Sequence, residues 1–144
     1  MSGSVLDFST LRSAIESLAD GLDVVGDAAW FPAQTPKVQN TLMAGVIQLF
    51  ELVFETSIKM IKLRIALDGR SAADVDPPKF QNLLREALKA GLIHDVEAWI
   101  VYRRKRNITA HTYDCAEAML IYGDILTFVA DARALLSELE MRNA

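Results

Sequence analysis

The feature that most constrains the fold is a stretch of about thirty residues, 38–67, in which apolar side chains recur at helical spacing. At 1.5 Å per residue, this helix is roughly 45 Å long. A helix of that length with an apolar stripe needs other helices to cover it, so the chain is expected to form a helical bundle. The positions near one face are Leu42, Val46, Leu49, Val53, Ile61 and Ile65.

Other stretches share this helical spacing, and no strand pattern competes with it. They begin near Phe8, Pro77, Asp95 and Asp114. The stretch from Pro77 ends at Gly91, and the stretch from Asp114 runs to the C-terminus. Residues 30–36 form a connector, because prolines at 32 and 36 forbid a helix through it. The sequence therefore predicts an all-α, antiparallel four- or five-helix bundle, with residues 1–144 as a single domain.

Composition excludes several classes of protein. The single cysteine, Cys115, cannot form an internal disulfide, and two histidines are too few for a structural zinc cluster. The N-terminus lacks the pattern of a signal peptide. The most apolar stretches, 42–54 and 119–130, fall short of the roughly 20 residues of a membrane span. We therefore expect a soluble cytoplasmic protein with no membrane association, no metal centre and no cofactor.

Four consecutive cations, Arg103, Arg104, Lys105 and Arg106, stand out in a chain with a net charge of −4. Such a run is often a solvated face. On a helix, however, successive side chains point about 100° apart, so these four cannot all lie on one side. Some of them should face a cleft or a partner, and forked arginine donors suit phosphate. Binding of RNA or phosphate by Arg103, Arg104 and Lys105 is the functional alternative.

The segment that follows contains Arg106, His111 and Tyr113, which together suit phosphodiester chemistry. Histidine moves a proton near neutral pH, and arginine stabilises charge on a phosphoryl oxygen. Taken alone, His111 is more often a structural histidine. On an unbroken helix it would lie about 140° from Arg106. Either the helix ends between residues 108 and 112, or two chains contribute to one site.

The pattern Arg106-Asn107-x-x-x-His111-x-Tyr113 resembles the R-x-x-x-x-H-x-Y signature of the HEPN superfamily, the higher eukaryote and prokaryote nucleotide-binding domains. More narrowly, the chain resembles the nucleotidyltransferase substrate-binding proteins, the HEPN partners of minimal nucleotidyltransferases (MNT). The resemblance covers roughly residues 8–140. It includes residues 48–55 with Lys59, 85–87, 91–93 and Trp99.

The resemblance implies a helical bundle that dimerises around a shared cleft and cleaves RNA without a metal, as the toxin of a HEPN/MNT toxin–antitoxin pair. It implies that Arg106 and His111 are catalytic and that Asn107 supports them. It also implies that the antitoxin silences the toxin by transferring a nucleotide to Tyr113. The older family name implies another role, a non-catalytic subunit that binds nucleotide or substrate for the nucleotidyltransferase.

Two further features leave alternatives open. Glu51, Glu55, Lys59 and Lys62 form a polar stripe, which is either a solvated face with a Glu55–Lys59 pair or a support beside the Arg106/His111 cleft. Trp99 is either a core residue or a platform for base stacking, and its spacing favours the core. A homodimer is expected, because each chain has one motif and a symmetric cleft doubles it. The other expected partners are an MNT-type nucleotidyltransferase and RNA.

Overall fold

The computed structural model describes residues 6–69, 77–109 and 115–142. In these ranges the secondary structure consists of helices, and no strand is present. This confirms the predicted fold class. The helices are α1 (Ser9–Val25), the short 3-10 turn η2 (Phe31–Ala33), α2 (Pro36–Leu67), α3 (Pro77–Lys89), α4 (Val96–Thr109), α5 (Cys115–Met119) and α6 (Tyr122–Arg142).

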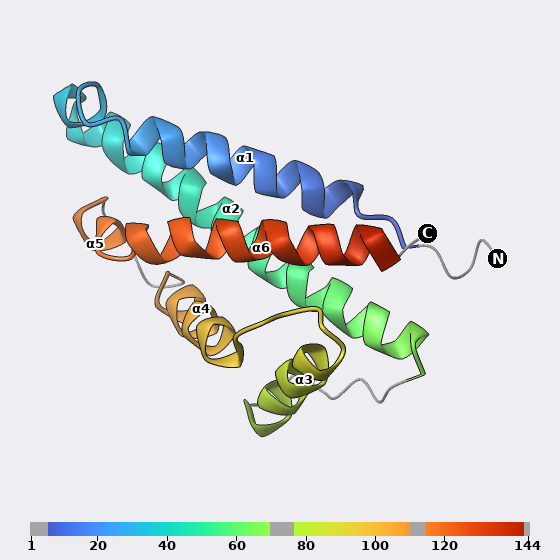
Figure 1. Ribbon diagram of the computed structural model, residues 1–144. Coiled ribbons are helices and arrows are strands. Elements are labelled where there is room, and N and C mark those ends of the chain that lie inside the picture. The colour runs from blue at the N-terminus through green and yellow to red at the C-terminus, as the bar shows by residue number, and fades with distance from the viewer. Residues whose placement is uncertain (1–5, 70–76, 110–114, 143–144) are drawn as a thin grey trace.

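Helix α2 is the centre of the bundle and contacts α1, α3, α4, α5 and α6. Helix α1 runs back along it, α6 crosses it, and α4 and α3 lie on the other side of α6 from α1 (Figure 1). By length and composition alone α2 could cross a membrane, and 44% of its most apolar window is buried inside the protein. Its apolar side chains are therefore shared among five packed helices.

The start of α2 lies two residues before the predicted position. The Thr35 hydroxyl accepts a hydrogen bond from the Val38 amide at 3.3 Å, and Pro36 occupies the first turn, where its missing N–H is harmless. The connector before it includes the 3-10 turn at Phe31–Ala33. As predicted, the prolines prevent one helix from running through the connector. Pro36, however, is the first residue of α2 and not the last residue of the connector.

The prediction of one continuous helix from Asp114 to the C-terminus is wrong, because the helix is broken between α5 and α6. At the break, the amides of Leu120 and Ile121 donate to carbonyls three residues back, each at 3.1 Å. This tighter turn places Ile121 in the core, 5% exposed, and leaves Leu120 84% exposed. Burial of Ile121 accounts for a break that the apolar pattern does not reveal.

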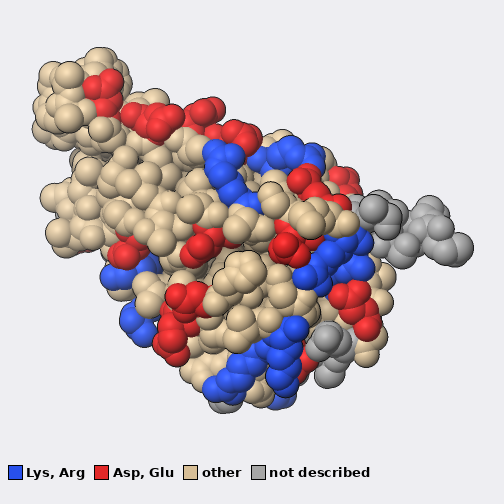
Figure 2. Space-filling view, in the orientation of Figure 1, with Lys and Arg blue, Asp and Glu red and all other residues tan. Residues whose placement is uncertain are grey.

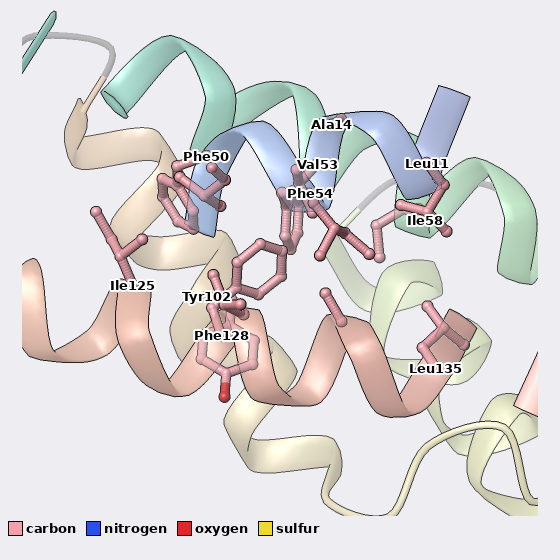
Figure 3. Packing of buried hydrophobic residues seen from close by; sticks show 14 of the residues in the cluster. Leu11, Ala14, Phe50, Val53, Phe54, Ile58, Tyr102, Ile125, Phe128 and Leu135 are labelled. Carbon is pink, nitrogen blue, oxygen red and sulfur yellow. The ribbon is translucent and has the colours of Figure 1, made fainter. Parts of the chain in front are cut away.

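An aromatic cluster joins the helices around α2. Phe128 of α6 lies with its ring centroid 5.2 Å from Phe50 and 5.0 Å from Tyr102. Figure 3 shows these side chains converging from α2, α4 and α6. Trp99 packs against Tyr102 and Phe128 and is 2% exposed, which confirms its assignment to the core.

Candidate functional site

The four consecutive cations of α4 diverge, as expected at 100° intervals. Arg103 places its guanidinium carbon 4.3 Å from the ring centroid of Phe80 on α3. Lys105 pairs with Asp124 of α6 at 3.5 Å, whereas Arg104 is exposed. Arg106 turns toward α2. The run is therefore not a single solvated face, and three of its members help to attach α4 to neighbouring helices.

Arg106 pairs with Glu55 of α2. Its Nε donates to Glu55 Oε2 at 3.1 Å, and its Nη2 donates to the same oxygen. The two side chains are 31% and 54% exposed, so the pair lies at the surface and can be reached by a ligand. In the described part of the chain, Glu55 has this partner rather than Lys59, so the expected Glu55–Lys59 pair is replaced by a contact between helices.

Glu51 lies one turn before Glu55 and contacts the end of α4. The Thr109 hydroxyl is 2.8 Å from Glu51 Oε2 and 2.7 Å from the Arg106 carbonyl oxygen. Because a hydroxyl has one hydrogen, it donates to one of these acceptors at a time. Thr109 is 3% exposed and ends α4. Thr109, the last described residue of α4, is thus held against α2, and most of the interval 108–112 in which the helix is expected to end lies outside the described residues.

The chain resumes its described course at Cys115, whose amide donates to Asn40 Oδ1 at 2.9 Å. Asn40 and Glu51 are eleven residues apart on α2, which brings them within about 20° of one another around the helix. The same face of α2 therefore holds both sides of the segment 110–114. His111 and Tyr113 belong to that segment and lie outside the described residues. Asn107, one residue after Arg106, is exposed.

A pocket of about 440 Å³ opens beside the Arg106–Glu55 pair. Phe54, Ile58, Leu63 and Phe80 supply its apolar lining, and its charged lining is Glu55, Lys59, Lys62 and Arg103. Glu55 thus belongs to the pocket and also holds Arg106. Three residues of the polar stripe predicted on α2 line this pocket, together with residues of α3 and α4, whereas the fourth, Glu51, contacts Thr109 instead.

Beneath the cations, the Tyr102 hydroxyl donates to Asp131 Oδ2 of α6. Burial raises the pKa of Tyr102 well above its usual range, and the hydrogen bond to Asp131 raises it further. The phenol therefore stays protonated at neutral pH. Its contacts indicate a structural role, which is to fix the position of α4 one turn before Arg106.

Charge is unevenly distributed over the surface. Figure 2 shows acidic side chains along α1 at the upper edge, with Lys and Arg beside them toward the right, while in the lower part Lys and Arg side chains lie next to acidic ones.

Sequence reasoning missed three residues that shape this site. Asn40 could have been found from its position on the same helical face as Glu51. Thr109 gave a weaker signal, as a threonine at the predicted end of a helix. Phe80 gave none, because its contact with Arg103 joins two helices whose relative position the pattern does not specify.

Comparison with known proteins gives consistent matches over nearly the whole chain. Residues 6–141 match the family described as nucleotidyltransferase substrate binding protein like. A Haemophilus influenzae protein named probable ribonuclease HepT is 42% identical over 138 residues, covering 96% of this chain and 94% of that protein. The solved structure of HI0074 from Haemophilus influenzae has a TM-score of 0.84 and 41% identity, covering 93% of this chain and 99% of that chain. It is described as the fold of a substrate binding domain of a nucleotidyltransferase.

Proposed function

The chain belongs to the family of nucleotidyltransferase substrate-binding-like proteins, and from this premise we propose that it is a HEPN-type, metal-independent endoribonuclease. It acts as the toxin of a toxin–antitoxin pair whose other member is an MNT-type nucleotidyltransferase. The relative named as a probable ribonuclease supports the activity. The family description supports the association with a nucleotidyltransferase.

The observation that carries the proposal is the position of Arg106. Glu55 takes the Nε and Nη2 side of its guanidinium, and no hydrogen bond in the described ranges uses Nη1. An arginine fixed along one edge presents its remaining donors in a constant direction, which suits recognition of a phosphate. Arg106 also lies three residues before the end of α4, so it adjoins the segment that contains His111.

The proposed reaction is transfer of a phosphodiester to the neighbouring ribose. His111 removes the proton of a 2′-hydroxyl as its oxygen attacks the adjacent phosphorus. The bond from phosphorus to the 5′-oxygen breaks, and that oxygen leaves with a proton. The products are a 2′,3′-cyclic phosphate and a 5′-hydroxyl. Arg106 offsets the charge that develops on the phosphoryl oxygens. Tethering of the nucleophile beside its phosphate supplies the proximity.

A homodimer would place two such motifs at one cleft. Exposed apolar residues flank the segment 110–114 in sequence, namely Ile108 at 47%, Met119 at 38% and Leu120 at 84% exposed. Burial of these side chains against a second copy would remove apolar surface from water beside the motif. This supports a dimer that brings together the ends of α4 and the α5 helices.

Silencing is proposed to act at Tyr113. Its phenol oxygen attacks the α-phosphorus of a nucleoside triphosphate held by the nucleotidyltransferase, and pyrophosphate leaves. The attached nucleotide adds negative charge and bulk close to Arg106 in sequence, so it competes with RNA for the same cations.

A second candidate function is a non-catalytic subunit that binds nucleotide or substrate for the nucleotidyltransferase. The description of HI0074 as a substrate binding domain favours it. Product chemistry separates the two functions. The proposed ribonuclease leaves 2′,3′-cyclic phosphate ends and fails at a position with 2′-deoxyribose. A protein that binds RNA but leaves it intact would be the binding subunit.

A further inference from the structure

The pocket between α2, α3 and α4 is distinct from the motif residues and combines two kinds of lining. Its apolar side comes from Phe54, Ile58 and Leu63 of α2 and from Phe80 of α3. Phe54 and Phe80 are 5% and 3% exposed, so they form a closed floor rather than projecting rings. With a volume of about 440 Å³, the pocket falls within the range of sites for small organic groups.

Arg103 gives this pocket a planar cationic wall. Its guanidinium carbon lies 4.3 Å from the Phe80 ring centroid, and the side chain lines the pocket. A guanidinium supported by an aromatic ring is a suitable surface for stacking a nucleobase, since bases stack on arginine planes as well as on aromatic rings. Such a contact accepts any base.

Glu55 gives the pocket a hydrogen-bond acceptor. Both bonds from Arg106 go to Glu55 Oε2, and in the described part of the chain no hydrogen bond uses Oε1. A carboxylate oxygen accepts from an amino group, as carboxylates do from the 4-amino group of cytosine. It repels a carbonyl oxygen at the same place. Glu55 can therefore distinguish bases that stacking does not.

We propose that this pocket binds one base of the RNA strand next to the phosphate held by Arg106, and that Glu55 selects a base with an exocyclic amino group. The base stacks on Arg103, and its own phosphate lies against Lys59 and Lys62. The inference rests on the proposed function for the position of the cleaved phosphate. Recognition of the base depends only on the pocket.

Charge and shape favour this occupant. The pocket has three cations and one carboxylate around an apolar floor. An apolar peptide segment would cover the ammonium groups of Lys59 and Lys62 without offering them an anion, whereas a nucleotide supplies both an apolar base and an anionic phosphate. The shared residue Glu55 places the base beside Arg106 within one continuous surface.

The test uses binding without cleavage. Short oligomers of 2′-O-methyl cytidine and 2′-O-methyl uridine lack the free 2′-hydroxyl and differ at position 4 of the base, amino against carbonyl. Fluorescence anisotropy with end-labelled oligomers gives their affinities for the full-length protein. We expect the cytidine oligomer to bind about tenfold more tightly, which is the value of one hydrogen bond to a charged acceptor.

Glu55→Gln is the decisive variant. Its amide keeps a carbonyl oxygen for Arg106 and presents an N–H₂ group to the base, so the preference should move from cytidine toward uridine. If Glu55 had a purely structural role, Glu55→Gln would lower the affinity for both oligomers equally. Equal affinities in the parent protein, or an unchanged cytidine preference in Glu55→Gln, would overturn the proposal.

Arg103→Gln tests the stacking wall, with Lys89→Gln as the matched control. Each change removes one positive charge. Lys89 lies nine residues after Phe80 on α3, about 180° away around the helix. We expect Arg103→Gln to lower the affinity for both oligomers about tenfold and Lys89→Gln to leave both affinities unchanged. If the two variants lost affinity equally, general electrostatic attraction would explain the binding, and the proposal would be overturned.

These outcomes are separable from those of the proposed function. Base-selective binding by a protein that leaves natural RNA intact would refute the ribonuclease and retain the pocket. Cleavage of RNA without any base preference would refute the pocket and retain the ribonuclease.

Discussion

Arg106 of α4 donates two hydrogen bonds to one carboxylate oxygen of Glu55 on α2, joining residues 51 positions apart in sequence. The contact fixes one edge of the guanidinium and, together with the Thr109–Glu51 contact, attaches the end of α4 to α2. The proposed phosphate contact of Arg106 thus depends on a carboxylate that also lines the neighbouring pocket.

Arg106→Lys should reduce the single-turnover rate of RNA cleavage at least about a hundredfold, because lysine cannot bond a carboxylate and a phosphate with one rigid fork. The unfolding temperature should change little, since exposed ion pairs contribute little stability. Arg133→Lys is the matched control, because Arg133 pairs with Glu16 at 2.9 Å in a similarly exposed position. Equal rates for the two variants would refute the role of Arg106.

Thr109→Val should lower the free energy of unfolding by about 1 kcal/mol, because valine fits the same space but cannot donate to Glu51. Urea unfolding measures this change. Thr127→Val is the control, since the exposed Thr127 hydroxyl donates within α6, to the Gly123 carbonyl at 3.1 Å. We expect a near-zero effect there. A loss at Thr127 as large as that at Thr109 would mean that Thr109 does not anchor α4 through Glu51.

Tyr113→Phe should keep most of the RNA cleavage but escape silencing by the cognate nucleotidyltransferase with ATP. Phenylalanine retains the ring and removes the oxygen that would accept the nucleotide. Intact-protein mass spectrometry reports the modification directly. The parent should gain the mass of one or more nucleotides, and the variant should not. An equal gain in both proteins would place the modification elsewhere.

Tyr102 should make stability depend on pH in the alkaline range. The folded-state pKa of Tyr102 is raised by burial and by Asp131, whereas in the unfolded chain it is about 10. Its contribution is therefore fully present below pH 10 and is lost as the pH rises above that value. The loss approaches about 1.4 kcal/mol per pH unit.

The comparison of Tyr102→Phe with the parent isolates this effect. The free energy of unfolding, measured by urea titration between pH 9 and pH 11.5, should fall less steeply in the variant. Tyr122→Phe serves as the control. Tyr122 lies on α6, and its hydroxyl donates to the Leu22 carbonyl, a neutral acceptor. Parallel curves for the parent and Tyr102→Phe would contradict the raised pKa.

Much of the fold follows from local signals in the sequence. The end of α3 is one example: the helix ends at Lys89, and two residues later the predicted stop, Gly91, adopts a φ of 79° while the Leu92 amide donates to the Ala87 carbonyl at 2.9 Å. The break after Met119 could not be predicted in this way. It depends on the burial of Ile121 against other helices, and the apolar pattern continues across it.

The candidate site divides in the same manner. The divergence of the cations follows from helical geometry alone. The partners of those cations cannot be derived from helical geometry. Glu55, Phe80 and Asp124 lie on three different helices, so their contacts depend on how these helices pack.

The most direct test is cleavage of RNA by the purified protein in the presence of a chelator, compared with His111→Ala and Arg106→Ala. We expect the parent to cut RNA and leave 2′,3′-cyclic phosphate ends. Both variants should keep their helical circular dichroism and lose at least about a hundredfold in rate, the range of a general acid–base group or an electrostatic stabiliser. A parent that leaves RNA intact, or folded variants that cut it at the parent rate, would contradict the assignment of this protein as a ribonuclease with Arg106 and His111 at its centre.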